Sequence, residues 1–235
     1  MDGEQRVTRE ALRAYFPRGG LGRRIVALPE HGCVYVKNLK AGCSTVTLWL
    51  HRIHTGDHEF VPQSARHAEF GTPHPGQIGW NRVTRMLSGD AFRFTFVRDP
   101  IRRAESAYRD KIVNTPEETF RDRVRQTLEL DGDAPVTLDV FVDALEVGDP
   151  VQMDAHWRPQ HLNLMHPVVT YDLVGRLENL AADLERVRDA CDLPDVAVVS
   201  RNPSTRVEDR PIADRPDLLR RVSEVYGRDF ELYGY

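Results

Sequence analysis

A short run of residues near the start of the chain carries groups that bind anions. Lys40 supplies a full positive charge, Ser44 and Thr45 supply hydroxyl donors, and Gly42 lets the backbone approach a ligand closely. An apolar helical run begins at Ser44 and Thr45, and the first backbone N–H groups of a helix, together with its dipole, favour a negative charge. The run therefore predicts a site for a phosphate or a similar anion.

A strand and a helix must hold this loop. Residues 34–36 are β-branched and aromatic, which is typical of a short buried strand. A polar turn from Lys37 to Gly42 follows, and apolar residues then recur at helical spacing as far as Ile53. The alternative is that Gly42 makes an ordinary turn and Lys40 is solvated, because short glycine motifs often match by chance.

A second candidate for anion binding follows another strand. Residues 92–97 predict a strand, and Arg98 lies where it ends and a helix begins, at the edge where open α/β sheets bind ligands. Asp99 is a suitable N-cap, and Ser106 lies two turns further along the same helix. The forked guanidinium of Arg98 matches a phosphate. The alternative is an Arg98–Asp99 ion pair with a Ser106 that faces its own helix.

The composition is that of a soluble globular protein. The chain has 235 residues, 40% of them apolar and 29% charged, enough for one sizeable α/β domain or at most two small ones. A net charge of -4 argues against nucleic acid as a partner but permits a local basic pocket. Cys33, Cys43 and Cys191 have neither disulfide-framework nor zinc-site spacing. Residues 1–10 are no signal peptide and no apolar run approaches the ~20 residues of a membrane span, so we expect a cytoplasmic protein.

Strands alternate with helices along the chain. The expected strands are 25–28, 34–36, 92–97, 168–174 and 196–199. The expected helices are 8–15, 44–53, 83–87, 101–113, 117–128, 138–145, 177–191 and 216–227. The alternation predicts the α/β class, with a mostly parallel central sheet flanked by helices in a single P-loop-like domain over residues 1–235. Residues 1–24 are a lead-in segment, and residues 55–79, rich in Gly, Pro and His, are the expected active-site loop region.

Two stretches in this order resemble the nucleotide-binding motifs of sulfotransferases that use 3′-phosphoadenylyl sulfate (PAPS). The first is KAGCST at 40–45, and the second is FTFVRDPIRRAESAYRDK at 94–111. The resemblance is to the branch that sulfates carbohydrates in animals, of the chondroitin 4-O- and HNK-1 types. It continues in HWRPQ at 156–160, YDLVGRLE at 171–178 and YGRDFELYGY at 226–235. It therefore touches most of the chain from residue 34 onward.

The resemblance implies a role for each motif. The first would hold the 5′-phosphosulfate, with Lys40 at the bridging oxygen and the cofactor-binding loop made by Ala41, Gly42, Cys43, Ser44 and Thr45. The second would hold the 3′-phosphate through Arg98 and Ser106.

The sequence also departs from the family pattern. Leu39 stands where relatives usually have proline, and Val46 where many have an aromatic residue, which leaves the adenine side unassigned. The animal relatives are Golgi membrane proteins with paired cysteines around this HWxPQ region. Here Met165 and Pro167 flank a histidine instead and no anchor is seen, so we expect a soluble bacterial member.

The reaction that the resemblance implies moves a neutral SO₃-like group from PAPS to an acceptor hydroxyl and releases PAP. Lys40 is the expected catalytic cation, a kind of group typically worth about 3–4 kcal/mol in the transition state. The acceptor also needs a base, and histidine suits neutral pH. We predict His74 or His67 for that role, although each on its own fits an ordinary loop histidine better. His58, His156 and Glu69 are the next candidates, and no metal is expected.

Two other functions are compatible with parts of the sequence. A P-loop phosphotransferase or nucleotide kinase would need Mg²⁺ and a lysine directly before the Ser/Thr, where Lys40 does not lie. A nucleotide-binding module without catalysis would need only the two anion sites. The acceptor, either a glycan or a small-molecule alcohol, and the oligomeric state have no signature in the sequence.

Overall fold

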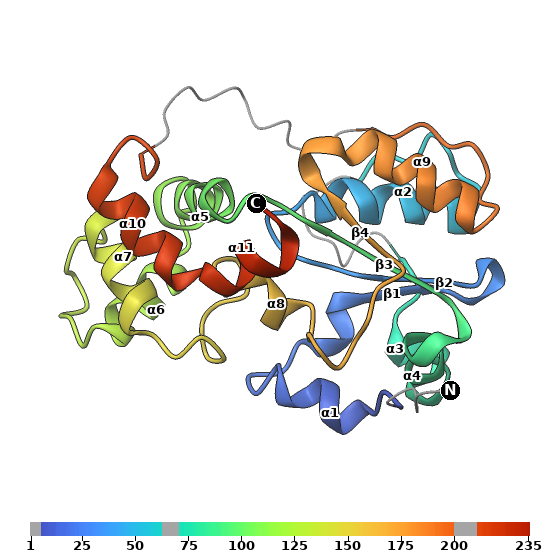
Figure 1. The fold of residues 1–235 in the computed structure, drawn as a ribbon, viewed down its shortest axis with the longest axis horizontal. Helices are drawn as coiled ribbons and strands as arrows, with labels where there is room; N and C mark the ends of the chain where they lie inside the picture. The colour runs from blue at the N-terminus through green and yellow to red at the C-terminus, as the bar shows by residue number, and fades with distance from the viewer. Residues whose placement is uncertain (1–5, 63–70, 200–210) are drawn as a thin grey trace. The chain divides into compact units, whose positions relative to one another are not determined.

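The computed structural model describes residues 6–62, 71–199 and 211–235. The chain forms two compact units (Figure 1). The first combines Met1–Val97 with Leu164–Pro203, and the second combines Arg98–Asn163 with Ser204–Tyr235. Each unit is therefore assembled from two separate stretches of the chain. The single domain expected over residues 1–235 stays a prediction.

A four-stranded sheet is the frame of the first unit, with its strands in the spatial order β1-β2-β3-β4. The strands are β1 (Ile25–Leu28), β2 (Cys33–Val36), β3 (Phe92–Val97) and β4 (Leu173–Arg176). β1 pairs with β2 antiparallel, whereas β2 with β3 and β3 with β4 are parallel. The predicted mostly parallel sheet is confirmed.

Helices cover both faces of this sheet (Figure 1). α2 (Cys43–Thr55) and α9 (Leu180–Ala190) lie on one face, and the other face carries α1 (Arg9–Ala14), α3 (Pro75–Ile78) and α4 (Trp80–Arg85). The predicted α/β class, with helices flanking the sheet, is confirmed.

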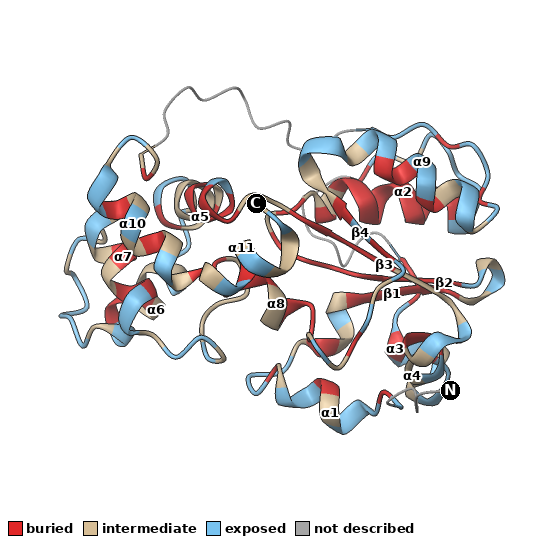
Figure 2. Cartoon of the chain, viewed as in Figure 1, coloured by how far each residue is buried: buried red, intermediate tan, exposed pale blue. Residues whose placement is uncertain are grey.

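Aromatic side chains fill the layer between the sheet and the helices α2 and α9. Tyr35, Phe94 and Phe96 are completely buried, and the rings of Tyr35 and Phe94 stack with their centroids 5.2 Å apart. Val46 and Trp49 of α2 pack into the same cluster. Because side chains alternate along a strand, these residues mark one face of the sheet. Figure 2 shows how thoroughly β2 and β3 are buried.

All the regular secondary structure in the described residues of the second unit is helical. Its helices are α5 (Pro100–Tyr108), α6 (Thr119–Thr127), α7 (Leu138–Val147), α8 (Gln160–Asn163), α10 (Pro216–Val225) and α11 (Gly227–Tyr233). A single π-helical turn, Arg109–Val113, continues α5. Phe141, Trp157 and Tyr226 lie at the centre of its apolar core.

Two buried charged side chains tie the loops of the second unit together. The carboxylate of Asp229, 0% exposed, accepts the backbone N–H of Gln160 at 2.6 Å and that of His161 at 2.9 Å. Arg103, 1% exposed, donates to the carbonyls of Arg158 and Ala155 at 2.8 and 3.1 Å. Charges this deep require such partners, because an unpaired buried charge is costly.

The helix caps were predictable from local chemistry. Thr8, Asp99 and Thr137 each accept a backbone N–H at the start of α1, α5 and α7, and for Asp99 this confirms the expected N-cap. The strand at 92–97 is also confirmed with its bounds.

Two strand predictions were wrong. The expected strand 168–174 is displaced toward the C-terminus, and only Leu173–Arg176 pairs with β3. Residues 196–199 form no strand; Val196 instead packs in the core and accepts a hydrogen bond from the Trp49 indole at 3.1 Å. Only Val196 is buried, whereas Val198 and Val199 are exposed, so the apolar run alone did not specify a buried strand.

None of the helices in the described part of the chain combines the length and the apolar character needed to cross a membrane.

Candidate functional site

Residues 40–45, called the anion loop below, connect β2 to α2 in the first unit. The loop follows the carboxyl end of β2, and its last residues form the first turn of α2, which begins at Cys43, one residue earlier than expected. Gly42 is the N-cap with φ of +76°, and Lys40 also has a positive φ, +67°. A positive φ is uncommon for a residue with a side chain, and such strain concentrates at functional sites.

The start of α2 supplies a set of aligned donors. The first backbone hydrogen bond of the helix runs from the N–H of Val46 to the carbonyl of Gly42 at 3.1 Å. The N–H groups of Cys43, Ser44 and Thr45 precede it and point toward the N-terminal end, as in any α-helix. This end carries the positive pole of a 13-residue helix. The expected strand, turn and helix start are therefore present in the first unit, and anion binding there stays a prediction.

Packing as well as conformation favours glycine at position 42. A Cβ atom there would lie 2.8 Å from Cδ1 of Leu177, which follows β4. The glycine thus lets the anion loop lie directly against the segment that joins β4 to α9.

A buried asparagine fixes the loop to the neighbouring strand. Asn38, 0% exposed, donates from Nδ2 to the carbonyl of Phe96 on β3 at 3.1 Å, and its own carbonyl accepts the N–H of Ala41 at 3.3 Å. The hydroxyl of Thr95 donates to the carbonyl of Val36 at 2.8 Å. These bonds join the ends of β2 and β3. Sequence reasoning missed both residues, because nothing in the pattern separates them from other small polar residues.

The second predicted motif lies in the second unit. Arg98 follows directly after β3, and the side-chain amide of Gln160 brackets its backbone, accepting its N–H at 3.0 Å and donating to its carbonyl at 2.8 Å. Asp99 caps α5 by accepting the N–H of Arg102 at 2.8 Å, and Ser106 is half-buried on that helix. Arg98 and Gln160 therefore lie together in the second unit. The anion loop belongs to the first unit.

The HWRPQ segment acts mainly through its last residue. Nδ1 of His156 lies 2.6 Å from the carboxylate of Asp154, so this histidine is held in a local pair. Gln160 instead reaches Arg98, and Asp229 on α11 holds the backbone of Gln160. The HWRPQ motif and the motif at 226–235 therefore meet behind the residue predicted to bind the 3′-phosphate.

His74 has a structural role in the fold. Its Nδ1 accepts the N–H of Gly76 at 3.1 Å, while Oε1 of Gln77 accepts the N–H of His74 at 3.2 Å, a reciprocal cap at the start of α3. The lone pair of Nδ1 is therefore engaged, and Nε2 carries the proton of the neutral ring. Its role as a base stays a prediction. His67 and Glu69 lie outside the described residues.

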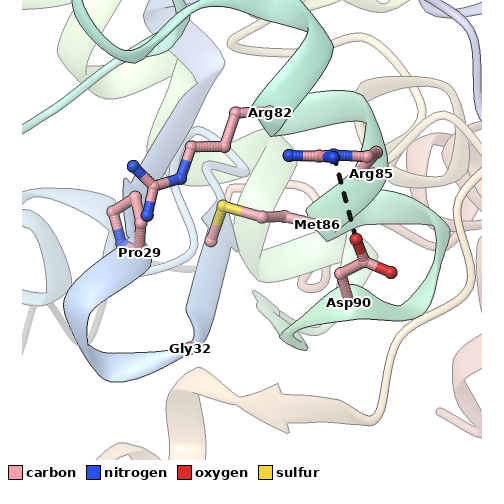
Figure 3. Close-up of a pocket in the computed structure, with 6 residues that line it drawn as sticks. All are labelled: Pro29, Gly32, Arg82, Arg85, Met86 and Asp90. Carbon is pink, nitrogen blue, oxygen red and sulfur yellow. Dashed lines mark ion pairs between the residues drawn. The ribbon is translucent and has the colours of Figure 1, made fainter.

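A small surface pocket occurs at the opposite end of β2 (Figure 3). It is lined by Pro29, Gly32, Arg82, Arg85, Met86 and Asp90. Arg85 and Asp90 form an exposed ion pair at 4.0 Å. The pocket contains none of the predicted site residues, so it is separate from the anion loop.

Comparison with known proteins identifies the family. Residues 23–235 match the model of the sulfotransferase family, and the chain belongs to that family.

The chain is also similar to curated proteins named carbohydrate sulfotransferase 14. The chain is 32% identical to carbohydrate sulfotransferase 14 of Mus musculus over 161 residues, which are 61% of this chain and 42% of the mouse protein. The Homo sapiens protein of that name matches over the same shares at 32%, and that of Danio rerio at 27% over 61% of this chain and 44% of its own length. The match thus spans less than half of each relative. No solved structure matches the chain.

Replacement of Gly42 by alanine tests the anion loop. We expect Gly42→Ala to lower the free energy of unfolding by at least the roughly 1–2 kcal/mol of a left-handed alanine, and to weaken nucleotide binding, because the loop must move away from Leu177. Urea unfolding and calorimetric titration measure the two effects.

Gly32→Ala is the matched control. Gly32 has φ of +58° at the turn between β1 and β2, and a Cβ there would meet nothing within 4 Å. It shares the backbone strain without the collision. Equal losses of stability in both variants, with unchanged nucleotide affinity in Gly42→Ala, would contradict the importance of this contact.

Proposed function

We propose that this protein transfers the sulfuryl group of PAPS to a hydroxyl of a carbohydrate or small-molecule acceptor and releases PAP. The observation that carries the proposal is the anion loop: a lysine and three helical N–H groups at the positive end of α2, in a chain of the sulfotransferase family. The names of the curated relatives support a carbohydrate as the acceptor.

The anion loop suits the part of PAPS that reacts. Helical N–H groups bind the 5′-phosphate, and Lys40 faces the oxygen that bridges phosphorus and sulfur. As the S–O bond breaks, negative charge grows on that oxygen, and a fixed cation stabilises it most in the transition state. A group of this kind is typically worth about 3–4 kcal/mol.

Arg98 and Ser106 suit the 3′-phosphate, which does not change during the reaction. The bracket that Gln160 places on the backbone of Arg98 supports this assignment, because it fixes the point from which the side chain extends. Asp229 in turn holds Gln160, so the C-terminal helix contributes to nucleotide binding without touching it.

Binding of PAP without metal is the first test. We expect saturating PAP to raise the melting temperature in the presence of EDTA, because Lys40, Arg98 and the start of α2 supply the countercharge. At one hundred times the dissociation constant the stabilisation is about 2.7 kcal/mol, or roughly 5–10 °C for a chain of this size.

ATP and AMP, each with and without Mg²⁺, are the control ligands. AMP lacks the 3′-phosphate and should stabilise less than PAP. A shift that required Mg²⁺ and favoured ATP would indicate a kinase instead. Transfer of label from [³⁵S]PAPS to a panel of oligosaccharides and simple alcohols then tests catalysis, and PAP binding without any transfer would indicate a nucleotide-binding module.

The two motifs should differ in kinetic effect. The Arg98 contact is equally strong in the ground and transition states, so Arg98→Ala should weaken PAP binding by about 10- to 150-fold, the equivalent of one charged hydrogen bond. Ser106→Ala should do the same more mildly. Lys40→Ala should lower kcat by about 10²–10³-fold with a smaller change in PAP affinity. Calorimetry and initial rates separate the two, and the reverse pattern would overturn the assignment.

His74→Asn separates capping from catalysis. Asparagine caps helices well but cannot serve as a base, so we expect α3 and the melting temperature to be retained while turnover falls by about 10²–10⁴-fold. His74→Ala should also lose roughly 1 kcal/mol of stability with the cap. If His74→Asn turns over normally, His74 only caps the helix, and the parallel His67→Asn variant identifies the base.

A further inference from the structure

Lys37 extends the antiparallel pairing of β1 and β2 by one residue. Its N–H donates to the carbonyl of Arg24 at 2.7 Å, directly beyond the pair Ile25 and Val36. Because side chains alternate along a strand, Lys37 projects from the same face as Tyr35. That face packs against α2, whose first residue, Cys43, is close enough to influence the Lys37 charge.

Lys37 is largely buried, and the described part of the chain supplies no counter-ion for its ammonium. The residue is 7% exposed, and across residues 6–62, 71–199 and 211–235 no hydrogen-bond acceptor or carboxylate is paired with it. Burial, together with the weaker effect of the Arg24 charge, lowers the pKa of Lys37 to about 8, whereas Cys43 on α2 acts in the opposite direction.

Three features at this point all disfavour a positive charge in the unliganded protein. The ammonium has lost water without gaining a partner. Arg24 lies directly across the ladder, and like charges at opposed positions destabilise a strand pair. The positive end of α2 begins close by. A neutral side chain would avoid all three costs, and a bound anion would remove them together.

We propose that Lys37 is a second cationic ligand of the sulfonucleotide, behind Lys40, and that the phosphosulfate of the bound donor is its missing counter-ion. This inference rests on the proposed function and deepens it. Because burial and the charge of Arg24 favour a neutral Lys37 in the free protein at alkaline pH, Lys37 gains a proton from solvent when the doubly negative phosphosulfate of the donor binds there. Lys37 therefore makes donor affinity depend on pH.

The chain is well suited to a direct test, because its lysines are Lys37, Lys40 and Lys111 alone. In protein labelled with [¹³C]lysine, the signal absent from Lys37→Met should titrate near pH 8 without ligand. Saturating PAP should move that titration above pH 9.5. The phosphates of PAP have already lost their last protons at these pH values, so the change belongs to the protein.

PAP binding by three variants and by the wild type, measured at several pH values, is the second test. Lys37→Met should weaken PAP binding by about 10- to 150-fold at pH 7 without lowering the melting temperature. Wild-type affinity should fall about tenfold per pH unit above pH 8, whereas Lys37→Arg should bind PAP with no such fall. Arg23→Met removes an exposed neighbouring charge of the same sign and should keep the wild-type profile.

The outcomes distinguish this inference from the function on which it rests. If PAP binds but the Lys37 titration does not move, and Lys37→Met binds PAP as tightly as the wild type, the role of Lys37 is overturned and the sulfotransferase proposal stands. If PAP does not bind to any variant or to the wild type, both are overturned. Should Lys37→Met fail to fold, the titration of the wild type with and without PAP decides alone, the signal being assigned through Lys37→Arg.

Discussion

The first unit is arranged so that the positive end of α2 and the charge of Lys40 lie at one point, and the geometry of the anion loop depends on this arrangement. The sheet places the helix there by ending β2 at Val36, and the chain then turns through two residues of positive φ before the helix begins. Hydrogen bonds from Asn38 and Thr95 hold this turn against β3, so the donors at the helix start are fixed before any ligand arrives. Fixed donors need no reorganisation when an anion binds, which is the condition for strong electrostatic stabilisation.

A different kind of support holds Arg98. Here the backbone of the functional residue is bracketed by the amide of Gln160, and the buried carboxylate of Asp229 holds that glutamine from behind. Each bond in the series uses a polar group that would be costly to bury alone. Loss of any one member would leave the others unsatisfied, so the series behaves as one structural element.

Local chemistry made the anion loop and the helix caps predictable. The strand, the glycine turn and the helix start around residues 40–45 can be read from neighbouring residues alone. In the same way, Asp99 before Pro100 specifies a helix start by itself. Gln160, Asp229 and Asn38 were not predictable in this way, because their function depends on partners between 58 and 69 residues away in the chain. The strand expected at 196–199 failed for another reason: only Val196 is buried, whereas Val198 and Val199 are exposed, so the apolar run did not indicate burial.

The interleaving of the two units has a consequence for synthesis of the chain. The sheet-bearing unit is complete once residue 203 has been made, whereas the unit that carries Arg98 needs residues up to 235. During translation the anion loop can therefore fold before Gln160 has its partner Asp229, because Asp229 is synthesised later, with α11. A chain released before residue 229 has been made would have a well-formed sheet and an unsupported Arg98.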